Sequence, residues 1–335
     1  MTFSLIICTY MRPKALLTLL KSVNKQTLYP NEILIVDGSN NEETKEIILH
    51  NNFENLSYYK VDEKNRGLTK QRNFGISRVS EDIEIVCFLD DDTVLEPNYF
   101  KQVIHTFNEN NNIIGVGGVA INENRWEPKN VDKKYNSNSY YELDGYVYPE
   151  GLRNRFRNYL GLTSQLASNC MPEFSHGRTS GYPLTGKCYE VDLLIGMSMS
   201  FRKTLFKHLC FSTYFEGYGL YEDADFSIRA LDYGKNVIDT KVQLSHYHDA
   251  AGRPNMYKYG KMVLRNGWYV WRVKYPHPSI KAKFKWHAVH GVLLFIRLLN
   301  VITTNERKSA LTDAVGRIVG WWSLIFNKPK IMHNV

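Results

Sequence analysis

Apolar, β-branched runs alternate with segments of helical spacing through the first 90 residues of the chain. The apolar runs have the length of strands, and several of them end directly in polar or acidic residues. They predict strands at 3–8, 32–36, 56–61 and 83–89. Apolar residues that recur every three or four positions predict helices at 14–24, 44–51 and 69–79. This alternation is typical of a largely parallel, doubly wound α/β sheet.

Polar side chains directly follow three of the predicted strands. They are Thr9 with Tyr10, then Asp37, and then the acidic run at 90–92. In doubly wound sheets the ligand crevice lies beyond the carboxyl ends of the strands. We therefore expect the three segments to line a single crevice.

The acidic run contains Asp90, Asp91 and Asp92. Carboxylates at alternate positions supply hard oxygen ligands, which suit Mg²⁺ or Mn²⁺ carrying phosphate oxygens. The run therefore predicts a metal that holds a diphosphate. Acidic clusters also occur in surface turns and at helix starts, so the run alone leaves both interpretations open.

Basic and amide side chains gather at the entrance of the helix predicted at 69–79. They lie in the segment 65–73, which includes Arg66, Arg72 and Asn73. Helix N-termini favour anions and arginine makes planar contacts with phosphate, so the group predicts a pyrophosphate clamp. A solvated helix start is an equally compatible interpretation.

Two later segments complete an ordered set of motifs. Residues 191–202 form an apolar run around a glycine, and residues 218–229 contain the pair Glu222-Asp223. With the earlier motifs they make residues 4–248 resemble the family 2 glycosyltransferases of the GT-A fold. The resemblance implies an α/β architecture with a Rossmann-like, doubly wound, mostly parallel sheet and a helical C-terminal extension.

The same resemblance implies how the chain divides. A GT-A catalytic domain is expected at 1–250, and a basic, amphipathic helical region at 251–335. Within the catalytic domain, 1–120 is expected to bind the nucleotide sugar and 121–250 to form the acceptor side. The stretch 121–180 lacks clear periodicity and is expected to form an insertion over the crevice, or an ordinary surface excursion.

The resemblance also implies roles for single residues on the donor side. In the family, residues matching Thr9 and Asp37 cradle the nucleotide base, and the first aspartate of the acidic motif contacts the ribose. Asp92 is expected to hold Mg²⁺ or Mn²⁺. The full set of expected donor-binding residues is Thr9, Tyr10, Asp37, Arg66, Arg72, Asn73, Asp90 and Asp91.

Asp223 matches the catalytic base of the family. A carboxylate suits that task because it takes the proton of the acceptor hydroxyl while the bond to the anomeric carbon forms, and inversion follows. Alternatively, the acidic residues complement the dipole of a helix start. The residues expected on the acceptor side are Gly196, Met197, Ser198 and Glu222. For Met197 a buried strand position is the alternative.

Two histidines follow the strand-like segment 237–244. Some relatives place a histidine near the metal at this point, so His246 or His248 is expected to join Asp92 in a mixed site compatible with Mn²⁺. A structural role for either histidine is the alternative.

The net charge of +8 belongs to the C-terminal region. Residues 251–335 carry 15 Lys and Arg against only two acidic residues, which leaves the first 250 residues with a net charge of −5. Basic residues beside Trp, Phe and Leu are typical of an amphipathic helix on an anionic leaflet, so 279–326 is expected to contact the membrane surface. The apolar run 288–302 contains an arginine and is too short to span a bilayer. Packing on the protein is the alternative.

Five cysteines without a CxxC pair argue against a disulfide framework and against a thiolate zinc site. The chain begins at once with a strand-like run, so no secretory signal is expected. The basic residues are interleaved with aliphatic runs, which argues against nucleic acid as a partner. We expect a cytoplasmic protein on the inner face of the cell membrane.

The motifs together predict an inverting, metal-dependent glycosyltransferase that moves a sugar from a nucleotide-diphosphate sugar to a saccharide or lipid-linked saccharide. The segment 257–275 is loosely similar to rhamnosyltransferases of bacterial surface-polysaccharide synthesis. One alternative is an inactive, membrane-associated saccharide-binding or scaffold protein. Another is a sugar-phosphate nucleotidyltransferase, but the glycine-rich loop expected after its first strand is absent here.

Overall fold

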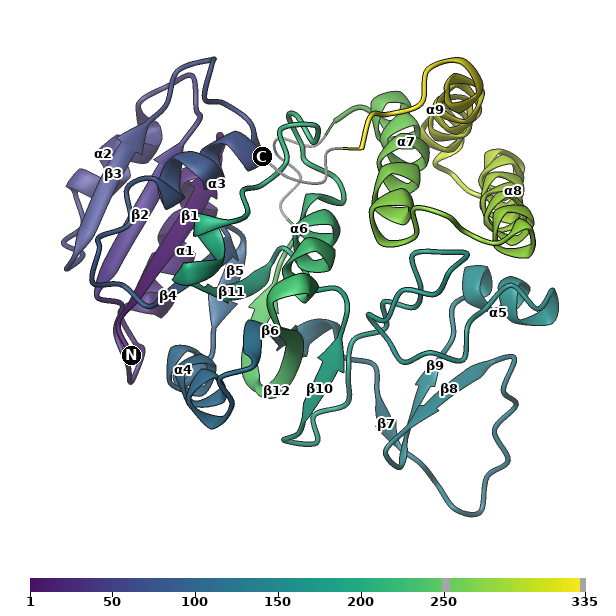
Figure 1. The fold of residues 1–335 in the computed structure, drawn as a ribbon, viewed down its shortest axis with the longest axis horizontal. Coiled ribbons are helices and arrows are strands. Elements are labelled where there is room, and N and C mark those ends of the chain that lie inside the picture. The colour runs from purple at the N-terminus through teal and green to yellow at the C-terminus, as the bar shows by residue number, and fades with distance from the viewer. Residues whose placement is uncertain (249–253, 332–335) are drawn as a thin grey trace. The chain divides into compact units, whose positions relative to one another are not determined.

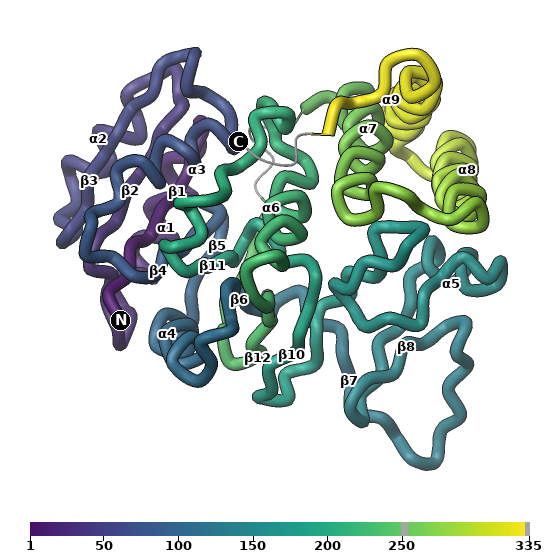
Figure 2. Tube along the Cα trace, viewed as in Figure 1, coloured from purple at the N-terminus to yellow at the C-terminus, as the bar shows by residue number. Residues whose placement is uncertain are grey.

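The computed structural model describes residues 1–248 and 254–331, and the chain forms two compact units. Of the described residues, 1–124 and 184–248 belong to the first unit, and 125–183 and 254–331 belong to the second (Figure 1). Figure 2 traces the chain from the first unit into the second and back again. The expected domain boundary at residues 250 and 251 lies outside the described residues, and that division stays a prediction.

The first unit is built on a mixed, mostly parallel sheet. The order of its strands is β10-β12-β6-β11-β4-β1-β2-β3, and β5 pairs with β12. The strands are β1 (Phe3–Thr9), β2 (Glu32–Asp37), β3 (Leu56–Lys60), β4 (Ile85–Asp90), β5 (Thr93–Leu95), β6 (Ile113–Ala120), β10 (Cys188–Val191), β11 (Ser198–Arg202) and β12 (Lys235–His246). The four strands predicted from the first 90 residues are confirmed, and β1 pairs in parallel with both β2 and β4.

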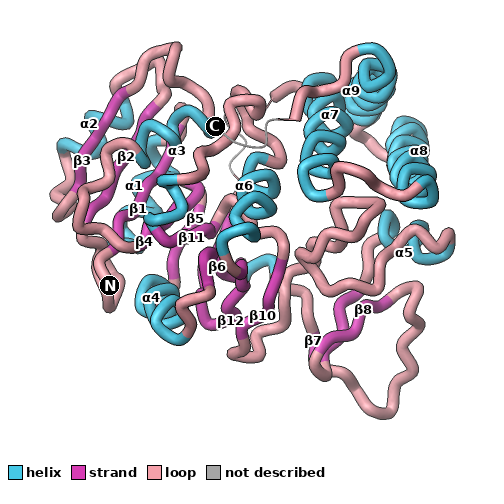
Figure 3. The backbone as a smooth tube through the Cα atoms, viewed as in Figure 1, coloured by secondary structure: helices cyan, strands magenta, loops and turns pink. Residues whose placement is uncertain are grey.

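Helices alternate with these strands along the chain, as Figure 3 shows. They are α1 (Pro13–Val23), α2 (Glu43–Leu49), α3 (Leu68–Ile76), α4 (Tyr99–Glu109) and α6 (Glu222–Ala230). The helices predicted at 14–24, 44–51 and 69–79 are thus confirmed to within a few residues at each end.

The alternation of side chains along β1 explains how the helices cover both faces of the sheet. Phe3, Leu5 and Ile7 belong to one buried cluster with residues of α1 and α4. Ile6 points to the opposite face, because successive side chains of a strand alternate. There α3 packs so closely that a β-carbon on Gly75 would lie 2.7 Å from Ile6 Cγ2.

The second unit combines a small sheet with a helical region. Its strands and helices are β7 (Glu127–Pro128), β8 (Tyr140–Leu143), β9 (Tyr146–Pro149), α5 (Leu152–Tyr159), α7 (Met256–Lys274), α8 (Ile280–Thr303) and α9 (Arg307–Phe326). The predicted helical C-terminal region is confirmed. Among the described helices, α8 has the length and apolar composition to cross a membrane, because it extends well beyond the apolar run 288–302.

Glycines let the backbones of α7 and α9 touch. A β-carbon on Gly260 would lie 2.3 Å from the carbonyl oxygen of Asp313, and one on Gly316 would lie 2.1 Å from that of Tyr257. Asp313 is fully buried at this crossing and accepts from Arg317 Nε at 2.9 Å. No side chain larger than hydrogen fits at the two glycines without moving a helix.

We expect Gly316→Ala to lower the free energy of unfolding by about 1–3 kcal/mol, because its β-carbon overlaps a backbone oxygen of the neighbouring helix. The matched control is Gly291→Ala in α8, where a β-carbon would meet Trp321 at an ordinary 3.7 Å. This control should be neutral or stabilising by up to about 1 kcal/mol, since alanine is the better helix former. Urea unfolding measures both, and equal effects would contradict the close approach of α7 and α9.

Candidate functional site

The carboxyl ends of three parallel strands lie side by side in the first unit. Thr9 is the register partner of Asp37, and Cys8 is the partner of Asp90. The three polar segments expected to share a crevice are therefore brought together. Their neighbour in the sheet is β11, which runs antiparallel to β4 and starts at Ser198, opposite Leu89.

Asp37 is fully buried at the carboxyl end of β2. Its buried carboxylate accepts from the backbone N–H of Ser39 at 2.7 Å and from the hydroxyl of Tyr58 at 2.8 Å. Burial, and secondly the bond to Asp37, raise the pKa of Tyr58, so its hydroxyl stays a donor. Tyr10 lies at the exposed end of β1 with 37% of its surface accessible.

A glutamine that the sequence motifs did not single out joins two strand ends. The Gln71 amide nitrogen donates to the carbonyl oxygens of Thr9 at 3.1 Å and Val36 at 2.8 Å. A β-carbon on Gly38 would meet Gln71 Oε1 at 3.1 Å and Arg66 Cγ at 3.2 Å. Arg66 therefore lies close to Gly38, directly after the end of β2, and its donor-binding role stays a prediction.

The central aspartate of the acidic run is tied to β1 and the loop that follows it. Thr9 Oγ1 donates to Asp91 Oδ2 at 2.6 Å, and Arg12 Nη1 lies 3.0 Å from the other oxygen. Burial raises the pKa of Asp91 to about 7, although Arg12 and Thr9 act in the opposite direction. Arg12 also lies 3.4 Å from Asp92 Oδ2, and it is a site residue that the sequence reasoning missed.

Arg72 is the buried cation of the crevice. Its guanidinium binds Glu222 and lies 3.5 Å from Asp90 Oδ1, above the rings of Phe211 and Phe88. Burial raises the pKa of Glu222 to about 8, although Arg72 lowers it. Burial also acts to lower the pKa of Arg72, but the charges of Glu222 and Asp90 outweigh it, so this pKa lies above its ordinary value.

Asn73, also expected to bind the donor, has a structural environment. Its amide nitrogen donates to the carbonyl oxygen of Phe211 at 2.8 Å, and its amide oxygen accepts from the Phe211 N–H at 2.9 Å. The side chain thus fastens α3 to the loop before α6. The pyrophosphate clamp expected from this segment stays a prediction for Arg66 and Arg72.

Asp223 lies in the first turn of α6 and keeps partial access to solvent. The N–H of Gly196 donates to its Oδ2 at 2.9 Å, and the N–H of Ala224 donates to its Oδ1 at 2.8 Å. A β-carbon on Gly196 would lie 3.5 Å from both Arg72 Nη2 and Glu222 Oε1 and 3.6 Å from Asp223 Oδ2. The glycine thus sits where the buried ion pair meets the partly exposed carboxylate.

The two remaining acceptor-side residues point into the core. Met197 belongs to the buried cluster beside α1 and α4. The hydroxyl of Ser198 lies 2.6 Å from the hydroxyl of Tyr99 and accepts from the N–H of Gly118 at 2.9 Å. Of the four residues expected on the acceptor side, Gly196 and Glu222 are the pair that lies beside Asp223.

Strand β12 brings a histidine to the acidic run. Its residue His246 pairs with Thr93, directly after the aspartates, and the His246 Nε2 atom lies 3.3 Å from Asp92 Oδ1. Burial lowers the pKa of His246, but its bond to Asp92 and the nearby carboxylates outweigh this and raise it. Single ligand atoms of Asp90, Asp92 and His246 lie within 4.8 Å of one another. Two carboxylates and an imidazole fit a Mn²⁺ or Mg²⁺ ion, which would relieve the crowded negative charge.

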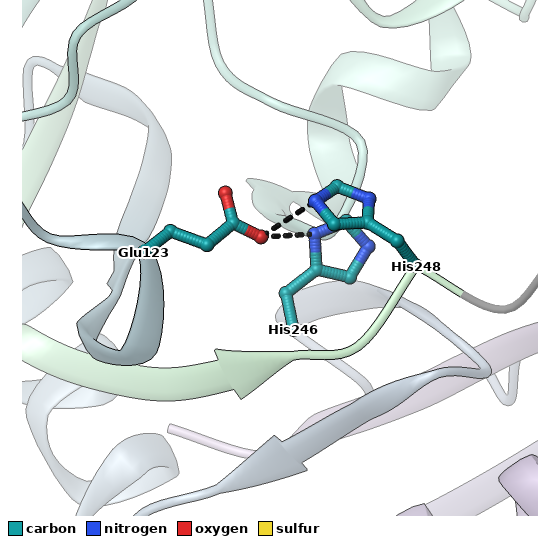
Figure 4. Close-up of side chains that lie close together, drawn as sticks. All are labelled: Glu123, His246 and His248. Atoms are coloured by element: carbon teal, nitrogen blue, oxygen red, sulfur yellow. Dashed lines mark ion pairs between the residues drawn. The ribbon is translucent and has the colours of Figure 1, made fainter. Parts of the chain in front are cut away.

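His248, the other expected metal ligand, lies in a different group. Its Nε2 atom is 2.7 Å from Oε1 of Glu123, which also lies 3.2 Å from His246 Nδ1 (Figure 4). The motifs gave no sign of Glu123, because it stands in the irregular stretch after β6.

Residues 4–167 match the family model described as glycosyl transferase family 2. Over this segment the chain is similar to that family. The resemblance that the motifs carry is thereby confirmed.

Among curated proteins, the chain is 28% identical over 133 residues to the glucosyl-dolichyl phosphate glucuronosyltransferase of Haloferax volcanii, covering 36% of this chain and 39% of that protein. It is 26% identical over 110 residues to an O-antigen chain rhamnosyltransferase of Salmonella typhimurium, covering 32% and 34%. An uncharacterized glycosyltransferase of Bacillus subtilis is 34% identical over 104 residues, covering 31% and 37%. The chain thus spans 34–39% of the length of these relatives.

Among solved structures, the fold is similar to the mannosyltransferase PcManGT of Pyrobaculum calidifontis, a complex with GDP-Man and Mn²⁺. The TM-score is 0.52 at 11% identity, with 98% of this chain and 88% of that chain covered. The fold is GT-A, as expected from the motifs.

We expect Arg72→Met to lower the free energy of unfolding by about 3–5 kcal/mol, because it leaves Glu222 buried without its cation. The control is Lys235→Met, which removes an ion pair with Glu190 whose side chains are 47% and 62% exposed. That exposed ion pair should contribute about 1 kcal/mol or less to the free energy of unfolding. Urea unfolding compares the two variants. A similarly small loss of unfolding free energy in both would show that Arg72 does not stabilise this part of the first unit.

Proposed function

We propose that the protein is an inverting, metal-dependent glycosyltransferase that uses a nucleotide-diphosphate sugar. The observation that carries this proposal is the convergence of Asp223 with the acidic run, joined through Arg72. A partly exposed carboxylate on α6 lies beside a buried arginine, which in turn lies 3.5 Å from Asp90. Similarity to the family and the GT-A fold support this function.

In this proposal the nucleotide-sugar donor lies along the carboxyl ends of the strands. Asp37 and Thr9 flank the nucleotide base, Asp90 contacts the ribose, and Arg66 stands near the diphosphate. Asp92 and His246 hold the metal, with Asp90 within reach of it. A Mn²⁺ or Mg²⁺ ion bound there neutralises the negative charge that develops on the leaving nucleoside diphosphate.

Asp223 is the catalytic base of the proposal. Its carboxylate takes the proton from the acceptor hydroxyl as the oxygen attacks the anomeric carbon from the side opposite the nucleotide. The N–H groups of Gly196 and Ala224 hold the carboxylate in one orientation. Attack opposite the leaving group inverts the configuration at that carbon.

The acceptor is a hydroxyl of a saccharide or lipid-linked saccharide, in the synthesis of cell-surface polysaccharide. The names of two relatives support this class. One is a glucosyl-dolichyl phosphate glucuronosyltransferase and the other an O-antigen chain rhamnosyltransferase. The donor sugar is then a hexose or a deoxyhexose.

The helices α8 and α9 provide the contact with an anionic membrane surface in this proposal, which places the enzyme on the inner face of the cell membrane. Lys281 and Lys283 are exposed at the start of α8. Large apolar side chains that are more than half exposed on the two helices are Ile280, Phe284, Phe295, Ile302, Trp322, Ile325 and Phe326. Lysines beside exposed aromatic and aliphatic side chains suit binding in the plane of an anionic leaflet.

We expect Asp223→Asn to lower turnover by about 10²–10⁴-fold, because the variant lacks the base, while donor binding persists. Donor binding is measured by thermal shift with UDP-, GDP- and dTDP-linked sugars, with and without Mn²⁺. Asp92→Asn is the complementary variant and should lose the Mn²⁺-dependent part of the shift. Near-normal turnover of Asp223→Asn would remove the catalytic role of Asp223.

Vesicle co-sedimentation tests the membrane contact. The protein should sediment with anionic vesicles at moderate salt, and Phe284→Ser should weaken the partition about tenfold or more, because burial of a phenylalanine contributes about 2 kcal/mol. Leu49→Ser is the matched control, since Leu49 is 73% exposed on α2 and Phe284 is 76% exposed. Protein that stays in solution with these vesicles would refute the contact.

A further inference from the structure

A carboxylate and two imidazoles gather at the edge of the crevice, all in the first unit. Glu123 ends the short 3₁₀ turn η1 (Ile121–Glu123) that follows β6, His246 ends β12, and His248 stands two residues later. Figure 4 shows the two rings turned toward the same oxygen of Glu123. The distances to that oxygen are 3.2 Å from His246 Nδ1 and 2.7 Å from His248 Nε2.

The backbone holds two of these residues in place. The Asn122 side chain donates to the carbonyl oxygen of His246 at 2.8 Å and accepts from the His246 N–H at 2.9 Å. Just before this clamp, β6 and β12 pair at Ala120 and Leu244. The residue next to Glu123 is therefore fastened to the strand end that carries His246.

The spacing of the three groups suits a small transition-metal ion. Ligands about 2.0–2.1 Å from a tetrahedral zinc ion stand roughly 3.3 Å from one another. The two measured separations are 3.2 and 2.7 Å, and the three ligand atoms all lie within 4.8 Å of one another. The side chains of Glu123 and His248 are 42% and 55% exposed and have room to rotate. Small rotations would bring their ligand atoms to bonding distance from a metal ion.

The donor types select the class of metal. Two imidazoles and one carboxylate form a set used for zinc, with a fourth position open to water or another ligand. Imidazole nitrogen favours Zn²⁺, Cu²⁺, Ni²⁺ and Co²⁺, whereas Mg²⁺ prefers a shell of oxygens. We propose that Glu123, His246 and His248 form a second metal site, one for transition-metal dications, at the edge of the crevice.

This second site is chemically distinct from the Asp90–Asp92–His246 group. His246 turns Nδ1 to Glu123 and Nε2 to Asp92. A neutral imidazole has one nitrogen free to bind a metal, while the other carries a proton. His246 serves the second site through Nδ1 when its Nε2 carries the proton and faces Asp92, so this site does not need Asp92 as a ligand and the two sites compete for His246.

The test is isothermal titration of the full chain with Zn²⁺, in an Asp92→Asn background that removes the other group. One equivalent of Zn²⁺ should bind, and Mg²⁺ at the same concentration should not compete. Glu123→Gln and His248→Ala should each weaken Zn²⁺ binding about tenfold or more, as loss of a ligand or of its support does. His105→Ala is the matched control, because His105 is also exposed and lies 3.0 Å from a glutamate, Glu109, and the pair belongs to no group of three metal-ligating side chains among the described residues.

The same titration can overturn the site. Undiminished Zn²⁺ affinity in His248→Ala, or no Zn²⁺ binding in a background that melts like the parent protein, would show that Glu123 only forms hydrogen bonds with the two rings. If the parent protein binds Zn²⁺ and the Asp92→Asn variant does not, the ion belongs to the acidic run instead. The titration measures Zn²⁺ binding in the absence of a sugar donor and acceptor, so its failure would remove the second site without testing the proposed transfer reaction.

Discussion

The burial of one guanidinium is the constraint on which the rest of the crevice depends. Arg72 is 2% exposed, and it lies between carboxylates contributed by β4 and α6. A buried charge is costly unless it is paired, so the three elements carrying Arg72, Asp90 and Glu222 must stay together. This pairing also leaves Asp223, the neighbour of Glu222, as the partly exposed acid beside Gly196. The pairing with Arg72 thus gives Glu222 a structural role and leaves the Asp223 carboxylate partly accessible to solvent.

Strand order provides the second organising principle. The acidic run follows β4, and β5 directly after it pairs with the end of β12. That pairing carries a histidine more than 150 positions further along the chain to the aspartates. The same strand end also meets the turn after β6, so His246 faces a carboxylate on each side. A single residue thereby links the proposed donor-binding metal group to the neighbouring Glu123 cluster.

The alternating part of the fold could be predicted because periodicity reports local structure. The first strands and helices follow from apolar spacing, and the convergence of Thr9, Asp37 and Asp90 follows from parallel strand ends. The partners of Arg12 and Gln71 could not be predicted, since they lie far from these residues in the sequence. Glu123 escaped notice because it stands in the stretch after β6, where the sequence shows no clear periodicity.

Predictions from residue type alone were also wrong about where some side chains point. Asn73 resembles a phosphate ligand at a helix entrance, yet its place on α3 turns its amide to the backbone of Phe211. Ser198 starts a strand whose alternation directs its hydroxyl inward, to Tyr99. Sequence gives the identity of such groups, whereas the phase of the helix or strand decides which way they face.

The backbone contact between α7 and α9 has a consequence for how the helical region opens. Where Gly260 and Gly316 let one helix rest directly on the carbonyl oxygens of the other, no layer of side chains remains to rearrange. Separating the helices therefore breaks the contacts at both glycines together, and no intermediate packing compensates for a partial separation. The two helices thus form one cooperative unit, whose amides become accessible to solvent exchange together and not helix by helix.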